Sequence, residues 1–150
     1  YVNLTTLDSL PFGASIDVRK GRVRLYAAGA NGRLQAASFH GGVFRIAQRG
    51  RYVDLKLRGP KPTCAKASAA QKKMKKPRKT RKRRLWGSGK GSFRTSGRYS
   101  AATVRGTKWL VEDRCRTTLT RVRSGVVTVR DFQRKRTIRL RAGQRYVARR

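Results

Sequence analysis

The feature that most constrains the fold of this chain is a run of positive charge near its middle. Between Gln71 and Arg84, ten of the fourteen residues are Lys or Arg and none is acidic. Like charges at this density repel one another and cannot be buried without partners. We therefore expect the run to stay solvated and extended until a polyanion binds it, and to divide the chain into two folded parts.

The rest of the chain is basic too. It contains 40 Lys and Arg against 6 Asp and Glu, a formal charge of +34 on 150 residues. Such an excess opposes compaction and attracts polymers of phosphate, sulfate or carboxylate groups. We therefore expect an anionic polymer as partner, and cell-wall polymer, acidic polysaccharide and nucleic acid all remain open. The predicted polyanion-binding residues are the cations of the run: Lys72, Lys73, Lys75, Lys76, Arg78, Lys79, Arg81, Lys82, Arg83 and Arg84.

Short segments with a period of two predict β-strands. Ile16 and Val18, and then Val23 and Leu25, alternate with polar residues on either side of a turn. The same pattern recurs at 43–46, 52–57, 126–129 and 138–140, and helix signals are nearly absent. We predict an all-β protein of two small roll-like or sandwich-like halves joined by a basic linker. The expected parts are an N-terminal arm at 1–10, a first β half at 11–59, the linker at 60–84 and a second β half at 85–150.

A five-residue element recurs within these segments. It begins at Gly21, Gly42, Gly91 and Gly125, and it continues with a spacer, an apolar residue, a polar residue and a β-former. Glycine lacks a Cβ and can take a positive φ, which allows a sharp turn. We expect glycine to begin each of these strands, and chance similarity between short strands is the alternative.

From Leu85 onward the sequence resembles the FecR-type domain, a β-rich module of bacterial periplasmic regulators and secreted proteins. The resemblance rests on Gly91–Thr95, Ala102–Thr107 leading into Trp109–Val111, Ser124–Val129 and Ile138–Gln144. It covers about residues 85–145. It implies a small all-β fold that binds or transduces and offers no catalytic residues. This chain departs from the signalling members in lacking a transmembrane helix and a recognisable anti-sigma segment.

Two cysteines, Cys64 and Cys115, are too few for a four-ligand zinc site unless His40 and a carboxylate join them. We predict a Cys64–Cys115 disulfide, with two unpaired thiols as the alternative. A disulfide favours an oxidising compartment, so we expect a secreted protein outside the cell or on its surface. No segment approaches the ~18 consecutive apolar residues of a membrane span.

The sequence favours no enzyme, cofactor or metal. His40 is the sole histidine, and we expect it to lie exposed in a hairpin turn. The adjacent carboxylates Glu112 and Asp113 would point to opposite faces of a strand. Trp86, Phe93 and Trp109 are expected in the core. Four tyrosines next to basic residues suit either amphipathic strands or base stacking, and we favour the strands: Tyr26, Tyr52, Tyr99 and Tyr146.

These features predict a secreted, non-enzymatic β protein that binds anionic polymers electrostatically. One alternative is a self-assembling subunit of an extracellular fibre or array, because residues 1–10 carry Val2, Leu4, Leu7 and Leu10 and would suit strand addition to a neighbouring copy. A second alternative is a nucleic-acid-packing protein.

Overall fold

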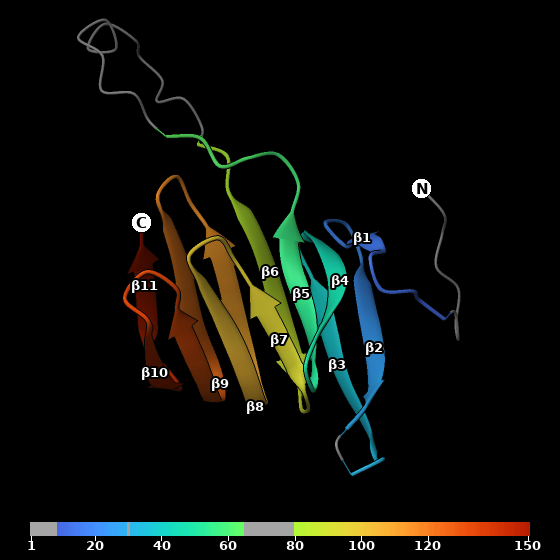
Figure 1. Cartoon of the computed structure of the whole chain (residues 1–150). Coiled ribbons are helices and arrows are strands. Elements are labelled where there is room, and N and C mark those ends of the chain that lie inside the picture. The colour runs from blue at the N-terminus through green and yellow to red at the C-terminus, as the bar shows by residue number, and fades with distance from the viewer. Residues whose placement is uncertain (1–8, 30, 65–79) are drawn as a thin grey trace, which may run out of the picture.

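The computed structural model describes residues 9–29, 31–64 and 80–150, and these ranges contain eleven β-strands and no helix (Figure 1). The strands are β1 (Ser15–Asp17), β2 (Arg22–Ala28), β3 (Leu34–His40), β4 (Val43–Arg49), β5 (Tyr52–Arg58), β6 (Arg83–Gly89), β7 (Phe93–Ser96), β8 (Ser100–Asp113), β9 (Thr117–Asp131), β10 (Arg136–Arg141) and β11 (Arg145–Arg149). The all-β prediction is confirmed. A helix able to cross a membrane does not occur in the described ranges.

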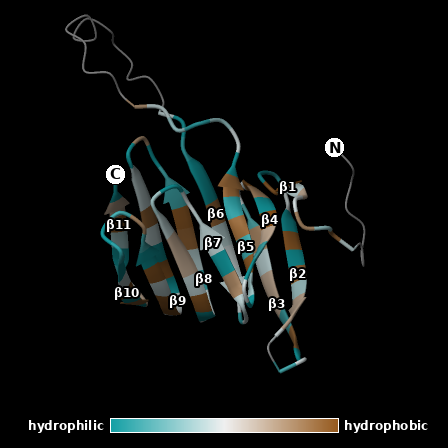
Figure 2. Ribbon diagram, viewed as in Figure 1, coloured by the Kyte–Doolittle hydropathy of each residue, from teal (hydrophilic) through white to brown (hydrophobic). Residues whose placement is uncertain are grey.

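The strands form where apolar and polar residues alternate, because successive side chains of a strand point to opposite faces. In β2, Leu25 is buried while its neighbours Arg24 and Tyr26 are exposed. In β4, Phe44 is buried and the next residue, Arg45, is exposed. Figure 2 shows this mixture of apolar and polar residues along the strands. One face of the sheet therefore forms the core and the other faces solvent.

The sheet is organised around the long hairpin of β8 and β9. Its register is interrupted between Arg105 and Trp109, where Gly106 and Gly125 have φ values of +66° and +76°. A Cβ on Gly125 would lie 2.2 Å from the Gly106 carbonyl oxygen, so only glycine fits there. Such an irregularity bends a strand and increases its twist. Gly125 therefore lies at a bend inside β9, and the expectation that it begins a strand is wrong.

The edge of β8 that faces away from β9 carries two neighbours. Residues 101–103 pair with β7, whereas 107–113 pair with β6. The sheet continues from β6 through β3 to β2, and from β7 through β5 and β4 to β1. We call β2, β3 and β6 the β6 wing, and β1, β4, β5 and β7 the β7 wing. Strands β10 and β11 pair with the opposite edge of β9.

The two wings pack against each other through an aromatic cluster. The Phe39 ring on β3 lies 5.9 Å from Phe44 on β4, 5.6 Å from Phe93 on β7 and 5.9 Å from Trp109 on β8. All four side chains are essentially inaccessible to water. The Trp109 indole N–H donates a hydrogen bond to the Thr95 hydroxyl at 3.2 Å, so its burial leaves no donor unpaired. The sheet therefore curls around one core.

The sheet does not divide into separate β units at 11–59 and 85–150. Strand β3 pairs with β6 and strand β5 pairs in parallel with β7, so each wing contains strands from both sides of the basic run. These pairings satisfy backbone N–H and C=O groups of β3 and β5 that would otherwise be unpaired at a sheet edge. Of the expected arm at 1–10, residues 1–8 lie outside the described ranges, and Leu10 packs against the core.

Candidate anion-binding surface

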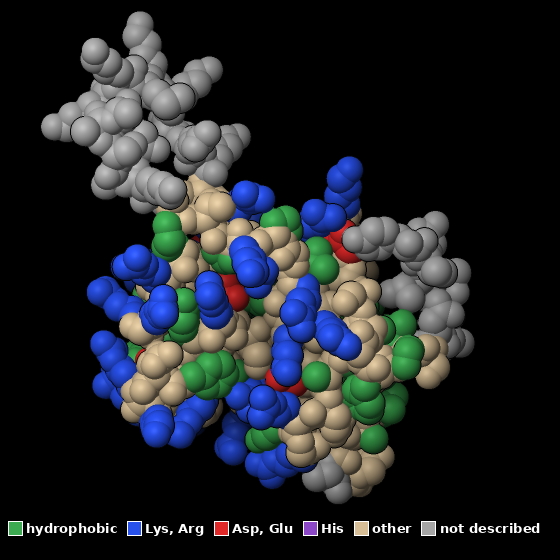
Figure 3. All heavy atoms as spheres, turned by 45° about the horizontal axis from the view of Figure 1, so that its top comes forward, with side chains coloured by type: hydrophobic (Ala, Val, Ile, Leu, Met, Phe, Trp, Pro, Cys, Tyr) green, Lys and Arg blue, Asp and Glu red, His purple; other side chains and the backbone are tan. Residues whose placement is uncertain are grey.

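The surface carries many cations and few groups that neutralise them. Figure 3 shows Lys and Arg side chains spread over the visible face with little acidic surface between them. Within the part of the chain that the structure describes, only Asp17 and Glu112 form ion pairs, with Arg19 for the first and with Lys82 and Arg114 for the second. Most cations of the described ranges therefore have no ion pair with a carboxylate of the protein.

Three buried carboxylates of the described ranges accept hydrogen bonds from neutral groups, and one of them, Asp131, accepts a bond from the Tyr146 hydroxyl at 2.7 Å. Asp54 accepts a bond from the Ser96 hydroxyl at 2.5 Å. Asp113 accepts bonds from the Thr118 hydroxyl at 2.6 Å and from the Arg98 backbone N–H at 2.8 Å. Burial raises the pKa of Asp113 above its ordinary value of 3.8, although these bonds and nearby arginines oppose the shift. Neither Asp54 nor Asp113 forms an ion pair within the described ranges, although Arg83 and Arg98 lie close enough to Asp113 to lower its pKa.

A pocket of about 380 Å³ opens on the outer face of the β7 wing, and its lining contains more basic side chains than acidic ones, the latter being Asp54 and Asp113. The Lys and Arg residues that line it are Arg49, Lys56, Arg58, Lys61, Arg83, Arg94 and Arg98. The Arg94 Nε is buried without a hydrogen-bond partner, and its guanidinium lies 5.9 Å from the centre of the Phe132 ring. Guanidinium groups with open donors suit bidentate contacts to phosphate, sulfate or carboxylate. This pocket is our first candidate anion site.

Sequence reasoning did not find the pocket. Its residues come from both sides of the basic run and meet only because β5 pairs with β7. Alternation gave a partial signal, since Arg94 lies between the buried Phe93 and Thr95 and must point outward. Nothing in the local sequence indicates that Lys56 and Ser96 lie opposite each other.

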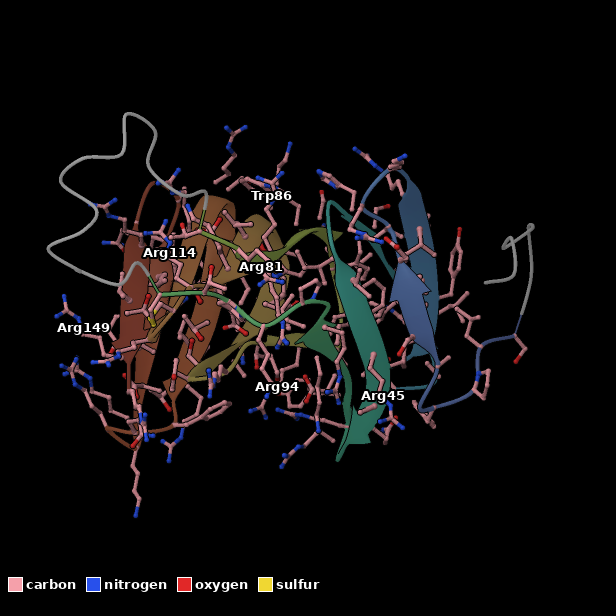
Figure 4. All side chains as sticks on the ribbon, turned by 90° about the horizontal axis from the view of Figure 1, so that it is seen from above. Arg45, Arg81, Trp86, Arg94, Arg114 and Arg149 are labelled. Carbon is pink, nitrogen blue, oxygen red and sulfur yellow. A yellow bond between two sulfur atoms is a disulfide. The ribbon has the colours of Figure 1, made fainter. Side chains whose placement is uncertain are left out.

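The second candidate anion site is the neck, which we define as residues 60–64 and 80–82. The two segments are joined by hydrogen bonds from the Thr63 N–H to the Arg81 carbonyl at 3.2 Å and from the Arg81 N–H to the Thr63 hydroxyl at 2.9 Å. Cys64 forms a disulfide with Cys115 in the β8–β9 turn, with Cα atoms 4.7 Å apart, which confirms the predicted pairing. Figure 1 shows the neck leading away from one end of the sheet, and Figure 4 looks down on that end.

The structure places four of the ten predicted binding residues. Arg81 lies exposed in the neck, and Lys82 is 3.9 Å from Glu112. Arg83 donates from Nε to the Pro60 carbonyl at 3.1 Å, and Arg84 is exposed on β6. The other six lie outside the described residues: Lys72, Lys73, Lys75, Lys76, Arg78 and Lys79.

The expected linker boundary at residue 84 is wrong. Arg83 and Arg84 are the first residues of β6, in register with Asp113 and Glu112 of β8. Acidic residues on the neighbouring strand offset their charge, which allows the sheet to begin within the basic run.

Two aromatic residues lie elsewhere than expected. Trp109 is buried as predicted, but Trp86 is half-buried and points outward from β6 (Figure 4). His40 is the last residue of β3 and is half-buried rather than exposed in a turn. Its ring is parallel to that of Trp86 within 8°, with centroids 6.4 Å apart. Partial burial, with Arg22 and Lys108 nearby, lowers the pKa of His40 below 6.5.

Metal and paired-carboxylate chemistry find no support in the described ranges. No group of three or more His, Cys, Asp or Glu side chains that could hold a metal ion occurs there. The neighbours Glu112 and Asp113 have different partners, because Glu112 accepts a bond from Arg114 while Asp113 bonds to Thr118.

Two substitutions of Asp113 distinguish the effect of its charge on stability from the effect of its hydrogen bonds. We expect Asp113→Ala to lower the free energy of unfolding by about 1–3 kcal/mol, because two buried donors lose their acceptor. Asp113→Asn keeps the accepting oxygen and should be neutral or stabilising at pH 7. Since the folded-state pKa is raised, the charged form adds no stability above that pKa, and the advantage of Asn over Asp should grow from pH 3 to pH 7. Urea unfolding measures both, and equal losses in the two variants would contradict this.

Comparisons with known proteins show a shared fold and no family. No family model matches the sequence, and no curated protein matches it. Two solved structures described as a "putative anti-sigma factor" from Parabacteroides distasonis ATCC 8503 are similar. One has 15% identity and a TM-score of 0.50, and the other 16% and 0.48. Each match covers 91% of this chain and 55% of the other, so this chain spans about half the length of those proteins. A β domain similar to theirs is shown, and the first match extends well beyond residues 85–145.

Proposed function

We propose that this protein binds anionic polymers electrostatically, outside the cell or on its surface, and does not act as an enzyme. The observation that carries the proposal is the shortage of ion pairs: in the described ranges, two carboxylates pair with only three cations. Cations without protein partners keep their attraction for an external polyanion, at little desolvation cost. The partner classes remain cell-wall polymer, acidic polysaccharide and nucleic acid.

Two regions supply the binding groups in this proposal. One is the basic run from Lys72 to Arg84, whose base is held at the neck by the Cys64–Cys115 disulfide. The other is the pocket on the β7 wing. A polymer that spans both regions gains from effective concentration, because binding at one region holds it near the other.

The family and the cellular location of the protein are also part of the proposal. We assign it to the FecR type on the motifs between Leu85 and Gln144, and the shared fold with a "putative anti-sigma factor" is compatible with that assignment. The disulfide supports an oxidising compartment. Assembly through residues 1–10 stays a prediction. Strand β2, which ends the sheet order on the β6 wing, alternates exposed arginines with apolar residues, a pattern that discourages strand addition.

Three variants with equal loss of charge test where the polymer binds. The first replaces Lys72, Lys73, Lys75 and Lys76 by Gln, and the second replaces Arg49, Lys56, Arg58 and Arg98 by Gln. The matched control replaces Arg134, Lys135, Arg139 and Arg141 by Gln, on the β9–β10 hairpin, and none of these four residues lines the pocket. Binding of heparin and of duplex DNA is measured by fluorescence anisotropy at low salt.

We expect the first two variants to lose about tenfold or more in affinity, since each removes several contacts to the polymer, and the control to lose much less. Melting temperatures should stay close to that of the unmodified protein, because none of the substituted residues that the structure describes belongs to the buried core. Failure of the unmodified protein to bind either polymer would contradict the proposed function. Equal losses of affinity in all three variants would show that the polymer responds to the overall positive charge and has no defined binding site.

A further inference from the structure

A row of outward-facing side chains crosses the β6 wing and continues onto β8, β9 and β11. The strand registers join Arg22 to His40, His40 to Trp86, Trp86 to Leu110, Leu110 to Arg121 and Arg121 to Arg145. Residues paired across a ladder point to the same face. At about 4.8 Å per strand, the row from Arg22 to Arg121 spans about 19 Å. Two rings and the buried Leu110 thus occupy its middle, and arginines occupy its ends.

Trp86 is the central feature of this row, and it does not serve the core. Its neighbours Leu85 and Gly87 point inward, and Gly87 makes room for Trp109, whose Cζ2 would lie 2.2 Å from an added Cβ. On the outer side, the Arg123 guanidinium lies 5.4 Å from the Trp86 ring centre, and the His40 ring is parallel to it. An indole in this position presents aromatic surface to solvent beside a cation.

The groups around Trp86 favour a ligand that offers hydrogen-bond acceptors and planar rings. Arg22 and Lys108 lie near enough to His40 to affect its ionisation. The carboxylate closest in register, Glu112, is already bonded to Arg114. A neutral polysaccharide would need acceptors for its hydroxyls, and this row offers mainly donors. Phosphates match the arginines of the row, and flat bases match its aromatic rings. Proteins that bind single strands with little sequence preference combine base–aromatic stacking with a basic groove in this way.

We propose that the row centred on Trp86, His40 and Arg123 binds single-stranded nucleic acid, with a base stacked on Trp86 and phosphates held by the flanking arginines. The inference rests on the proposed function, because it names the class of polyanion that the outer face of the β6 wing prefers. Duplex DNA is a poorer match, because its bases are already stacked on one another. Inorganic polyphosphate and heparin can engage the arginines but have no base to stack.

The two tryptophans provide a direct test. Trp109 is fully buried, so a stacked base quenches the fluorescence of Trp86 alone. Oligothymidylate is titrated into the intact protein, with polyphosphate and heparin as probes that carry charge without bases. The variants are Trp86→Ala, Trp86→Phe and, as matched control, Tyr52→Ala on the β7 wing, where Arg51 lies 5.2 Å from the Tyr52 ring centre.

We expect oligothymidylate to quench fluorescence while polyphosphate leaves it nearly unchanged. Trp86→Ala should lower affinity for oligothymidylate about tenfold, Trp86→Phe should retain much of it, and Tyr52→Ala should have little effect. Neither Trp86 variant should alter polyphosphate affinity or the salt dependence, because indole carries no charge. The near-ultraviolet circular dichroism signal of the buried Trp109 shows whether the core of the Trp86→Ala variant stays packed.

The remaining outcomes separate the two proposals. If all three polymers bind but oligothymidylate causes no quenching, the stacking site is refuted and electrostatic binding stands. If Trp86→Ala weakens heparin and oligothymidylate equally, Trp86 contacts a feature common to both polymers and the nucleic-acid assignment is wrong. If none of the polymers binds at low salt, both proposals fail.

Discussion

Removing the Cys64–Cys115 disulfide is expected to lower the free energy of unfolding by about 4 kcal/mol. The bridge closes a loop with a sequence separation of 51, and the entropy that it removes from the unfolded chain grows with the logarithm of loop length. The loop contains the whole basic run, whose like charges repel one another in the unfolded chain and gain freedom once the bridge is lost. Urea unfolding of a Cys64→Ser, Cys115→Ser variant measures the loss.

Folded-state controls distinguish this effect from damage to the sheet. Neither cysteine lies within a strand or in the aromatic cluster, so far-ultraviolet circular dichroism should keep its β signature. The unmodified protein under reducing conditions should unfold at the same urea concentration as the variant. A loss below about 1 kcal/mol would show that hydrogen bonds of the neck, such as that from Arg81 to Thr63, already restrict the loop in the unfolded ensemble.

Local patterns predicted the strands well. The alternation around Leu25 and Phe44 fixes which side chains face inward, because it depends only on the period of an extended chain. Cysteine count alone pointed to the Cys64–Cys115 pair. These inferences need no knowledge of which strands are neighbours.

The order of strands could not be predicted in this way. The pairing of β5 with β7 joins Leu55 to Thr95, and the pairing of β3 with β6 joins His40 to Trp86, across the whole basic run. Several strand orders bury the same apolar residues, and the sequence does not distinguish their backbone pairings. The pocket on the β7 wing and the row centred on Trp86 depend on these pairings, so neither could be predicted before the sheet was known.

The position of Trp86 shows how a correct pattern can be misinterpreted. Trp86 and Trp109 both lie in segments with an apolar or strand-like pattern, and large aromatic residues there are usually buried. The alternation of Leu85, Trp86 and Gly87 leaves Trp86 on the face opposite to Leu85. Gly87 is the signal that sequence reasoning missed, since a glycine between strand residues often marks the close approach of a bulky group.

The fold explains how a domain with so much charge can remain folded. The cations of the described strands lie on the outer faces of the sheet, while aromatic and aliphatic side chains fill the space between the wings (Figure 4). Surface charges in water repel one another weakly at physiological salt, where the Debye length is about 8 Å. The same arrangement leaves both outer faces open to a polyanion.

The salt dependence of binding tests the central claim most directly. Affinity for duplex DNA is measured by anisotropy between about 50 and 200 mM monovalent salt, and the logarithm of the association constant is plotted against that of the salt concentration. If about 6–8 phosphates are neutralised, the slope should be about −5 to −7, and affinity should fall by about three to four orders of magnitude over this range. Sequences of equal length should give similar values. A slope near zero, or strong preference for one sequence, would contradict electrostatic binding of anionic polymers as the function of this surface.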